Sequence, residues 1–341
     1  MKYMYGVYDR VLKKLATRLP DSFGGVFDGW TCAREHYIAF FATWTTNEGN
    51  VETRLLCCGV QDLPDEDEGE TADSFGLTAA DVGDYILNSA LLKYNKSFEN
   101  LEFLAGDNCS VNKLLVEGIT EWYRIHKNIN RVLPLVGCAS HRLNLAVQKL
   151  WKKDSDPYHD VVKAVHALHV SLRSVKNSYK LSAKSRVTPQ LEQDTRWSSC
   201  YKMMKSFFEI IPVLSDCGFD RDTRLLFLSG SQIEEARELL DILEVVQSVS
   251  LELQGGNPEK NNLYTARLLF DNLIKDYPGL GFEFSIGVNA AIVHDRAFES
   301  AMVKLQGPTE AALTAVEREA VKIFKETAGD ASTETHEARK N

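Results

Sequence analysis

The sequence contains no window that approaches 18 consecutive apolar residues, so it predicts no membrane span. Its first ten residues mix charged and aromatic side chains without a long apolar run, which is not typical of a secretory signal. It also has no Cys-x-x-Cys pair, and its seven cysteines are scattered over 341 residues. An odd, dispersed set argues against a disulfide framework and for a reducing compartment, so we expect an intracellular protein that is not secreted.

Net positive charge is lacking as well, since 39 Lys and Arg stand against 48 Asp and Glu, a balance of −9. That balance alone argues against a nucleic-acid-binding protein. The distribution along the chain differs, because between His141 and Lys205 there are 13 basic and 5 acidic residues, a local balance of +8 that leaves −17 for the remainder. A basic stretch in an acidic chain is either a phosphate-facing surface or an ordinary solvated helix face.

The chain is long enough to bury one large core or two, with 44% hydrophobic and 10% aromatic residues. Apolar periodicity and turn chemistry together predict its strands and helices. Expected strands span 23–30, 37–45, 51–60, 101–108 and 132–137, and expected helices span 1–20, 78–91, 110–126, 140–151, 161–179, 203–214, 232–253 and 264–277. The first three strands are joined by short turns and predict an antiparallel meander, and the chain becomes all-helical after about residue 201.

Two segments have no apolar periodicity. Residues 61–77 hold seven acidic residues together with Pro64 and Gly69. We expect a solvated loop there rather than a metal cluster, because nothing apolar fixes the geometry of the acids. The tail at 329–341 is polar and is expected to be disordered.

An apolar run that ends in an acidic residue occurs twice. The run Phe23–Trp30 contains glycines and carries Asp28 near its end, and the run Leu101–Asn108 carries Asp107 in the same way. Adjacent strands lie about 4.8 Å apart. If these two strands are neighbours, their carboxylates can hold one or two divalent metal ions through hard oxygen ligands. The alternative is that each Asp caps a turn at the end of its strand.

Four short motifs occur in a fixed order along the chain. They are Asp-Gly-Trp at 28–30, Gly-Asp-Asn at 106–108, Cys-Ala-Ser-His-Arg-Leu-Asn-Leu at 138–145 and Asp-Thr-Arg-Trp-Ser-Ser at 194–199. Their order and approximate spacing resemble those of the hAT superfamily of DNA transposases. The resemblance implies an α/β fold, with an RNase H-like mixed sheet and flanking helices at 21–200 and an all-helical, insertion-like region at 201–328.

By the same resemblance, Asp28 and Asp107 match the first two of three carboxylates that hold two Mg²⁺ ions in DNA transposition of the DDE type. The third carboxylate belongs to a Glu on a late helix, within a motif that contains Ser and Phe. The late glutamates of this chain do not lie in that context: Glu244, Glu283, Glu299, Glu310, Glu317 and Glu319. We therefore expect a degenerate site that holds Mg²⁺ weakly and has lost strand cleavage.

The resemblance also implies residues that contact DNA. Trp197 matches an aromatic residue that stacks on an unpaired or flipped base, and Arg196 beside it is suited to a phosphate. The alternative for Trp197 is a buried anchor of the helical region. His141 and Arg142 belong to a motif implied to lie near the active site and to contact DNA. Cys138 and His141 are spaced like zinc ligands, but two ligands do not make a site, so zinc is not expected.

Many members of the family carry a zinc finger of the BED type before the core, and the Cys and His pairs that it requires are absent here. We therefore expect a truncated or domesticated, nuclear hAT transposase-like protein that retains nucleic-acid binding. DNA is the expected partner, with a second copy or another protein as a further one, and no membrane. Two alternatives stay open: an active Mg²⁺-dependent transposase or nuclease, and a protein-interaction module derived from a transposase.

Overall fold

The computed structural model describes residues 2–32, 35–61, 78–128, 131–193, 196–254, 262–308 and 312–324. Nearly all of the expected acidic loop and the whole of the expected disordered tail lie outside these residues. The chain divides into two compact units, which are described separately here. The sheet unit comprises residues 1–138, 257–265 and 291–341, and the helical unit comprises residues 139–256 and 266–290.

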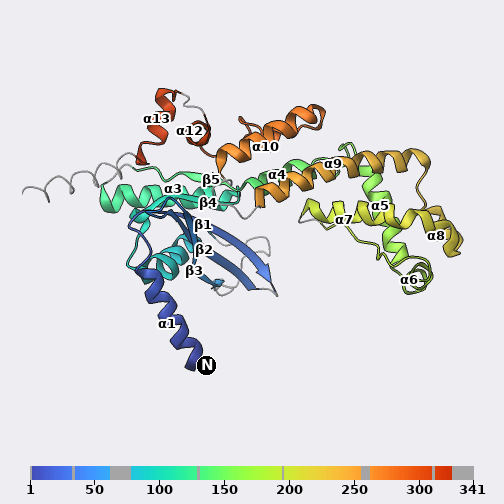
Figure 1. The fold of residues 1–341 in the computed structure, drawn as a ribbon, viewed down its shortest axis with the longest axis horizontal. Helices are drawn as coiled ribbons and strands as arrows, with labels where there is room; N and C mark the ends of the chain where they lie inside the picture. Colours follow the sequence, from blue (N-terminus) through green and yellow to red (C-terminus); the bar gives the residue numbers. More distant parts are fainter. Residues whose placement is uncertain are drawn as a thin grey trace, which may run out of the picture. The chain divides into compact units, whose positions relative to one another are not determined.

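The sheet unit combines a five-stranded sheet with flanking helices (Figure 1). The strands are β1 (Phe23–Cys32), β2 (Glu35–Thr45), β3 (Val51–Gln61), β4 (Leu101–Gly106) and β5 (Leu135–Gly137). The α-helices are α1 (Lys2–Ala16), α2 (Ala79–Tyr85), α3 (Ser110–Lys127), α12 (Arg296–Gln306) and α13 (Ala315–Ala320). The predicted mixed α/β class is therefore confirmed.

The strands form one mixed sheet in the order β3-β2-β1-β4-β5. Strands β1, β2 and β3 pair antiparallel, which confirms the predicted meander, whereas β4 pairs parallel with both β1 and β5. Strand β5 is shorter than the predicted 132–137. Pro134 precedes it and has no backbone N–H for a ladder bond, although its carbonyl accepts the N–H of Leu104 at 2.9 Å.

One face of the sheet packs into the core of the unit. Ile38, Phe40 and Ala42 alternate along β2 and are all buried. Burial of each large apolar side chain contributes about 1.5–3 kcal/mol to folding. Gly25 of β1 is required by this packing, because a Cβ there would lie 2.7 Å from the Phe40 ring. Helix α2 begins with a capping box, in which Thr78 and Asp81 exchange hydrogen bonds.

The chain returns to the sheet unit after the helical unit. Phe298, Ala301 and Val321, from α12 and the end of α13, pack together with Val136 of β5. The segment before α12 is tied to the end of β4, because the side-chain amide of Asn108 donates to the carbonyl of Ile292 at 3.1 Å. The last described helices therefore belong to the same unit as the sheet.

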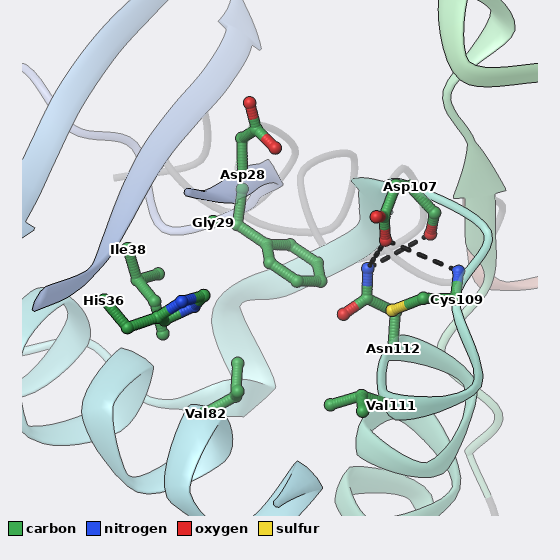
Figure 2. Close-up of a pocket in the computed structure, with 10 residues that line it drawn as sticks. Asp28, Gly29, His36, Ile38, Val82, Asp107, Cys109, Val111 and Asn112 are labelled. Carbon is green, nitrogen blue, oxygen red and sulfur yellow. Dashed lines mark hydrogen bonds between the residues drawn. The ribbon is translucent and has the colours of Figure 1, made fainter. Parts of the chain in front are cut away.

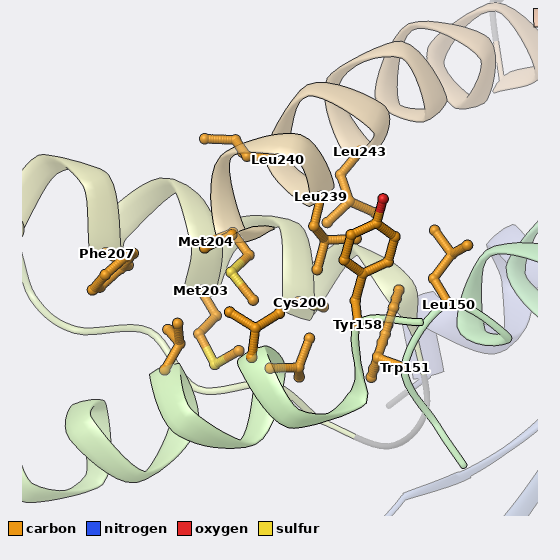
Figure 3. Close-up of a cluster of buried hydrophobic side chains, with 14 of the residues drawn as sticks. Leu150, Trp151, Tyr158, Cys200, Met203, Met204, Phe207, Leu239, Leu240 and Leu243 are labelled. Carbon is orange, nitrogen blue, oxygen red and sulfur yellow. The ribbon is translucent and has the colours of Figure 1, made fainter. Parts of the chain in front are cut away.

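The helical unit is built from helices that share a core of their own. They are α4 (Ala139–Gln148), α5 (His159–Leu172), α6 (Val175–Ser182), α7 (Trp197–Ile210), α8 (Arg221–Leu225), α9 (Gly230–Gln254), most of α10 (Leu263–Asp276) and α11 (Glu283–Ile286). Met203 and Phe207 of α7 and Leu239 and Leu243 of α9 all belong to that core (Figure 3). Of the helices in the described part of the chain, none combines the length and apolar character needed to cross a membrane.

The unit boundary at residue 138 differs from the predicted end of the core near residue 200. Helix α4 lies within the range 21–200 that the resemblance implied for the core, but its Leu143 and Val147 are fully buried in the core of the helical unit. An amphipathic stripe indicates that a helix packs on something and does not indicate on which layer it packs.

The single helix predicted over 161–179 is divided into α5 and α6. Asn177 accounts for the division, because its side-chain amide donates to the carbonyl of Ser171 and to the hydroxyl of Thr223, each at 3.0 Å. Satisfying that buried amide turns the chain between the two helices. Val175, which continues the apolar spacing of the predicted helix, is 89% exposed.

Candidate functional site

The two predicted acidic residues lie at the same end of adjacent strands. In the parallel pair of β1 and β4, Val26 stands opposite Ala105, and each acidic residue follows its strand partner by two positions. Asp28 and Asp107 therefore belong to the same edge of the sheet, as the sequence predicted if the strands were neighbours.

Both acidic residues line one pocket of about 240 Å³ (Figure 2). The remaining lining residues come from β1, β2, α2 and the start of α3: Phe27, Gly29, His36, Ile38, Val82, Cys109, Val111 and Asn112. Ile38, Val82 and Val111 give it an apolar floor. Carboxylate, amide and imidazole groups lie around that floor, so the pocket combines polar groups with a surface that excludes water.

The carboxylate of Asp107 is held by the first turn of α3. The side-chain amide of Asn112 donates to its Oδ1 at 2.5 Å, and the backbone N–H of Cys109 donates to the same atom at 3.4 Å. The turn-capping role considered for Asp107 is thus present in the structure. Burial raises the pKa of the Cys109 thiol, and the neighbouring Asp107 carboxylate adds to the rise. Cys109 is therefore a neutral neighbour of the site at ordinary pH.

The side chain of Asp28 is exposed, and in Figure 2 it points away from Val82 and His36. Two residues further along the same strand, Trp30 stacks on Tyr37 of β2, with ring centroids 5.5 Å apart and planes at 11°. Alternation along a strand places Asp28 and Trp30 on one side of the sheet. A cation from solvent can therefore reach the exposed Asp28 carboxylate.

A third acidic residue does not join them in the described residues, where no group of three or more His, Cys, Asp and Glu side chains is arranged to hold a metal ion. Glu317 is bound within its own unit, because Lys304 donates to it at 2.7 Å and Ser300 at 2.6 Å. Glu244 and Glu283 belong to the helical unit, and Glu310 lies outside the described residues.

The predicted DNA-contacting residues occupy different environments in the helical unit. Trp197 is buried at 5% exposure in the core, as the alternative interpretation held, and its backbone N–H donates to Asn144 at 2.9 Å. Little of its ring surface is open to a base. Arg142 is buried at 3% exposure and donates to the carbonyls of Ser285 and Gly287. Its guanidinium therefore serves internal packing in this arrangement rather than a phosphate.

Arg196 is exposed immediately before α7, and His141 is half-buried on α4. Their predicted contacts with DNA stay predictions. Cys138 is exposed at the end of β5, and its backbone N–H donates to the carbonyl of Gly106 at 2.7 Å. That bond gives Cys138 a place at the junction between strand and helix.

Sequence reasoning missed two polar residues that line the pocket. Asn112 follows Asp107 by five residues, and the signal that would have found it is its place in the first turn of a helix that starts beside an acidic residue. His36 of β2 stands opposite Thr31 of β1, and its ring lies beside Gly29. A Cβ added at Gly29 would lie 3.1 Å from the Nε2 of His36. Its place follows only from the register between β1 and β2.

Comparison with known proteins yields no family for the chain, since neither a family model nor a curated protein matches it.

The carboxylates of Asp28 and Asp107 suit Mg²⁺ or Mn²⁺ better than zinc. Two carboxylates at one pocket edge are the hard oxygen ligands that Mg²⁺ and Mn²⁺ accept, usually with several waters retained. Thiolate or imidazole sets that favour zinc are not assembled among the described residues. The arrangement is thus suited to an exchangeable divalent ion at an open rim.

Proposed function

We propose that this chain is a hAT transposase-like protein whose sheet unit is an RNase H-like core that binds a divalent ion and nucleic acid without cutting strands. The observation that carries the proposal is the parallel pairing of β1 with β4, which brings Asp28 and Asp107 to one pocket. The strand order β3-β2-β1-β4-β5 supports it, because it combines an antiparallel meander with two parallel strands as the resemblance implies.

The path of the chain supports the same proposal. The chain leaves the sheet unit directly after β5, forms the helical unit and returns before α12. The resemblance implies an all-helical insertion before the late helix that carries the third acid. In this chain the described late helices, α12 and α13, use Glu317 for an internal ion pair with Lys304.

The chemistry follows from the two carboxylates. A divalent ion held by Asp28 and Asp107 would supply positive charge at the pocket edge, where a phosphate group is otherwise repelled. Asn112 orients the Asp107 carboxylate. Among the described residues no third carboxylate joins the pair to fix a second ion, so on this proposal the protein binds a phosphodiester and does not activate water to attack it.

Charge in the helical unit favours DNA as the partner. The stretch His141–Lys205, with its 13 basic against 5 acidic residues, lies entirely in this unit, and the rest of the unit has 5 basic against 13 acidic. The unit is neutral overall and its excess of basic residues lies in one stretch of sequence, which favours attraction of phosphates to that stretch. We extend the proposal to a nuclear protein whose other partner is a second copy or another protein.

The test is a pair of assays on the purified chain. In the first, nicking of a hairpin and of a nicked-end DNA substrate is followed in Mg²⁺ and in Mn²⁺, with Asp28→Asn and Asp107→Asn as controls. We expect no cleavage by any of the three proteins. Cleavage by the unmodified chain that both substitutions abolish would contradict the loss of activity and would show that a third ligand completes the site.

In the second assay, DNA binding is measured between 50 and 200 mM salt. We expect the affinity to fall steeply as salt rises, because phosphate contacts release counterions. Failure to bind DNA at low salt would contradict the proposed nucleic-acid binding.

A further inference from the structure

Helix α6 exposes one aliphatic and one aromatic side chain to solvent. Val175 is 89% exposed and Tyr179 is 79% exposed, one turn apart on the same side of the helix. The opposite side carries Asn177 and Leu181, which are buried. The division between α5 and α6 thus leaves Val175 and Tyr179 exposed to solvent. Packing within the helical unit does not account for their exposure.

The surroundings of this exposed ring are basic. Residues 161–191 contain six Lys and Arg and no Asp or Glu. Arg173, Lys176, Lys184 and Arg186 are exposed before, on and just after α6. Together with Tyr179, these four residues are called the α6 surface here.

The segment after α6 holds its basic residues in a defined turn. The backbone N–H groups of Lys184 and Ser185 donate to the carbonyl of the buried Leu181 at 2.9 and 2.8 Å. Val187 then packs against the core of the unit. Lys184 and Arg186 are therefore carried on an anchored turn beside the helix, which lowers the entropy lost when they bind a ligand.

Asp220 faces the α6 surface from a neighbouring element, and Asp216 and Lys184 both lie close enough to Cys217 to influence its thiol. Asp220 lies 3.3 Å from Lys176, in a pair whose side chains are 68% and 45% exposed for Lys176 and Asp220 respectively. Asp220 also caps α8 by accepting the N–H of Thr223 at 3.0 Å. An ion pair this exposed contributes little, so Lys176 remains available to a phosphate.

We propose that the α6 surface binds single-stranded DNA, with the Tyr179 ring stacked on an unpaired base and the four basic side chains on its phosphates. An aromatic ring in solvent can stack on a base only where the base is not already paired, which selects a single strand over a duplex. The basic side chains supply the complementary charge, and an acidic peptide would leave the ring without a planar partner. The inference rests on the proposed nucleic-acid binding and assigns that binding to the α6 surface.

The test measures binding of a fluorescein-labelled oligo(dT) 20-mer by anisotropy, using the full chain. Stacking of one base implies that Tyr179→Ala binds about 5- to 150-fold more weakly, while Tyr179→Phe retains the ring and most of the affinity. Leu251→Ala, an exposed apolar change on α9, is the matched control and should leave affinity unchanged. Circular dichroism of each variant reports that the exposed substitutions leave the fold intact.

The charge is tested separately. Combining Lys184→Gln with Arg186→Gln should reduce the magnitude of the slope of log affinity against log salt by about 1.4, since each phosphate contact on a single strand accounts for about 0.7. An unchanged slope overturns the phosphate contacts.

The outcomes separate this inference from the proposed function. Strong binding of oligo(dT) that Tyr179→Ala does not weaken overturns the α6 surface and leaves nucleic-acid binding in place. No binding of oligo(dT) by the unmodified chain overturns the α6 surface, and the DNA-binding assay above then decides whether the proposed function also fails. Equal competition by a poly-Glu peptide of 20 residues overturns the assignment of single-stranded DNA in favour of any polyanion.

Discussion

At the scale of single residues, the two acidic side chains of the candidate site differ in how firmly hydrogen bonds hold them. Asp107 is bound to Asn112 and to the start of α3, whereas Asp28 is exposed on its strand. Both were found from the sequence, because an apolar run that ends in an acid is a local pattern. Asn112 and His36 were missed, because their places depend on a helix start and on strand register that no local pattern contains.

The carboxylate of Glu317 in the sheet unit makes stability depend on pH. Hydrogen bonds from Lys304, from Ser300 and from the N–H of Thr314, in decreasing order of effect, together lower the pKa of Glu317 from 4.5 to about 2. A folded-state pKa below the unfolded value gives stability that is present above pH 4.5 and is lost as the pH falls toward 2.

We predict that Glu317→Gln lowers the thermal midpoint at pH 6 and that the gap to the unmodified chain narrows as the pH falls to 3. Thermal melts of both proteins across that range measure it. A gap that stays constant with pH would mean that the charge of Glu317 does not stabilise the α12–α13 pair.

At the scale of elements, the sequence predicted those strands and turns whose ends are marked by local turn residues. The meander of β1, β2 and β3 was predicted from short turns between apolar runs. The division of the 161–179 helix was not, because Val175 and Tyr179 continue the helical spacing without Gly or Pro. The interruption comes from hydrogen bonds of Asn177 to residues elsewhere in the fold.

We predict that Asn177→Ala destabilises the helical unit by about 1–3 kcal/mol, because a buried donor is removed and the Thr223 hydroxyl and Ser171 carbonyl lose a partner. Urea unfolding followed by circular dichroism gives the value. Ser178→Ala, next to it on the exposed side of α6, is the control and should change stability by less than about 0.5 kcal/mol. Equal effects of the two changes would remove Asn177 as the cause of the division.

At the scale of the whole molecule, the chain has separate cores. The helical core draws on residues of the helical unit, and the sheet core draws on residues of the sheet unit. The sequence indicated two regions with a boundary near residue 200, whereas the two compact units divide at residue 138. The apolar stripe of α4 fits a sheet or a helix layer equally well.

Two cores predict two unfolding transitions. Phe40→Ala in the sheet core and Phe207→Ala in the helical core each remove a fully buried ring and should cost about 3–5 kcal/mol. In differential scanning calorimetry we expect each substitution to shift a different transition. A single transition that both substitutions lower would show that the units unfold together.

The central claim is that Asp28 and Asp107 form one site, and Mn²⁺ binding tests it most directly. Free Mn²⁺ is followed by electron paramagnetic resonance during titration of the unmodified chain, Asp28→Asn, Asp107→Asn and the double variant. We predict one weak site, a loss of at least about tenfold (1.4 kcal/mol) in each single variant, and little further loss in the double variant, because one site can be lost only once. Unchanged affinity in either single variant, or losses that add in full, would contradict a shared site.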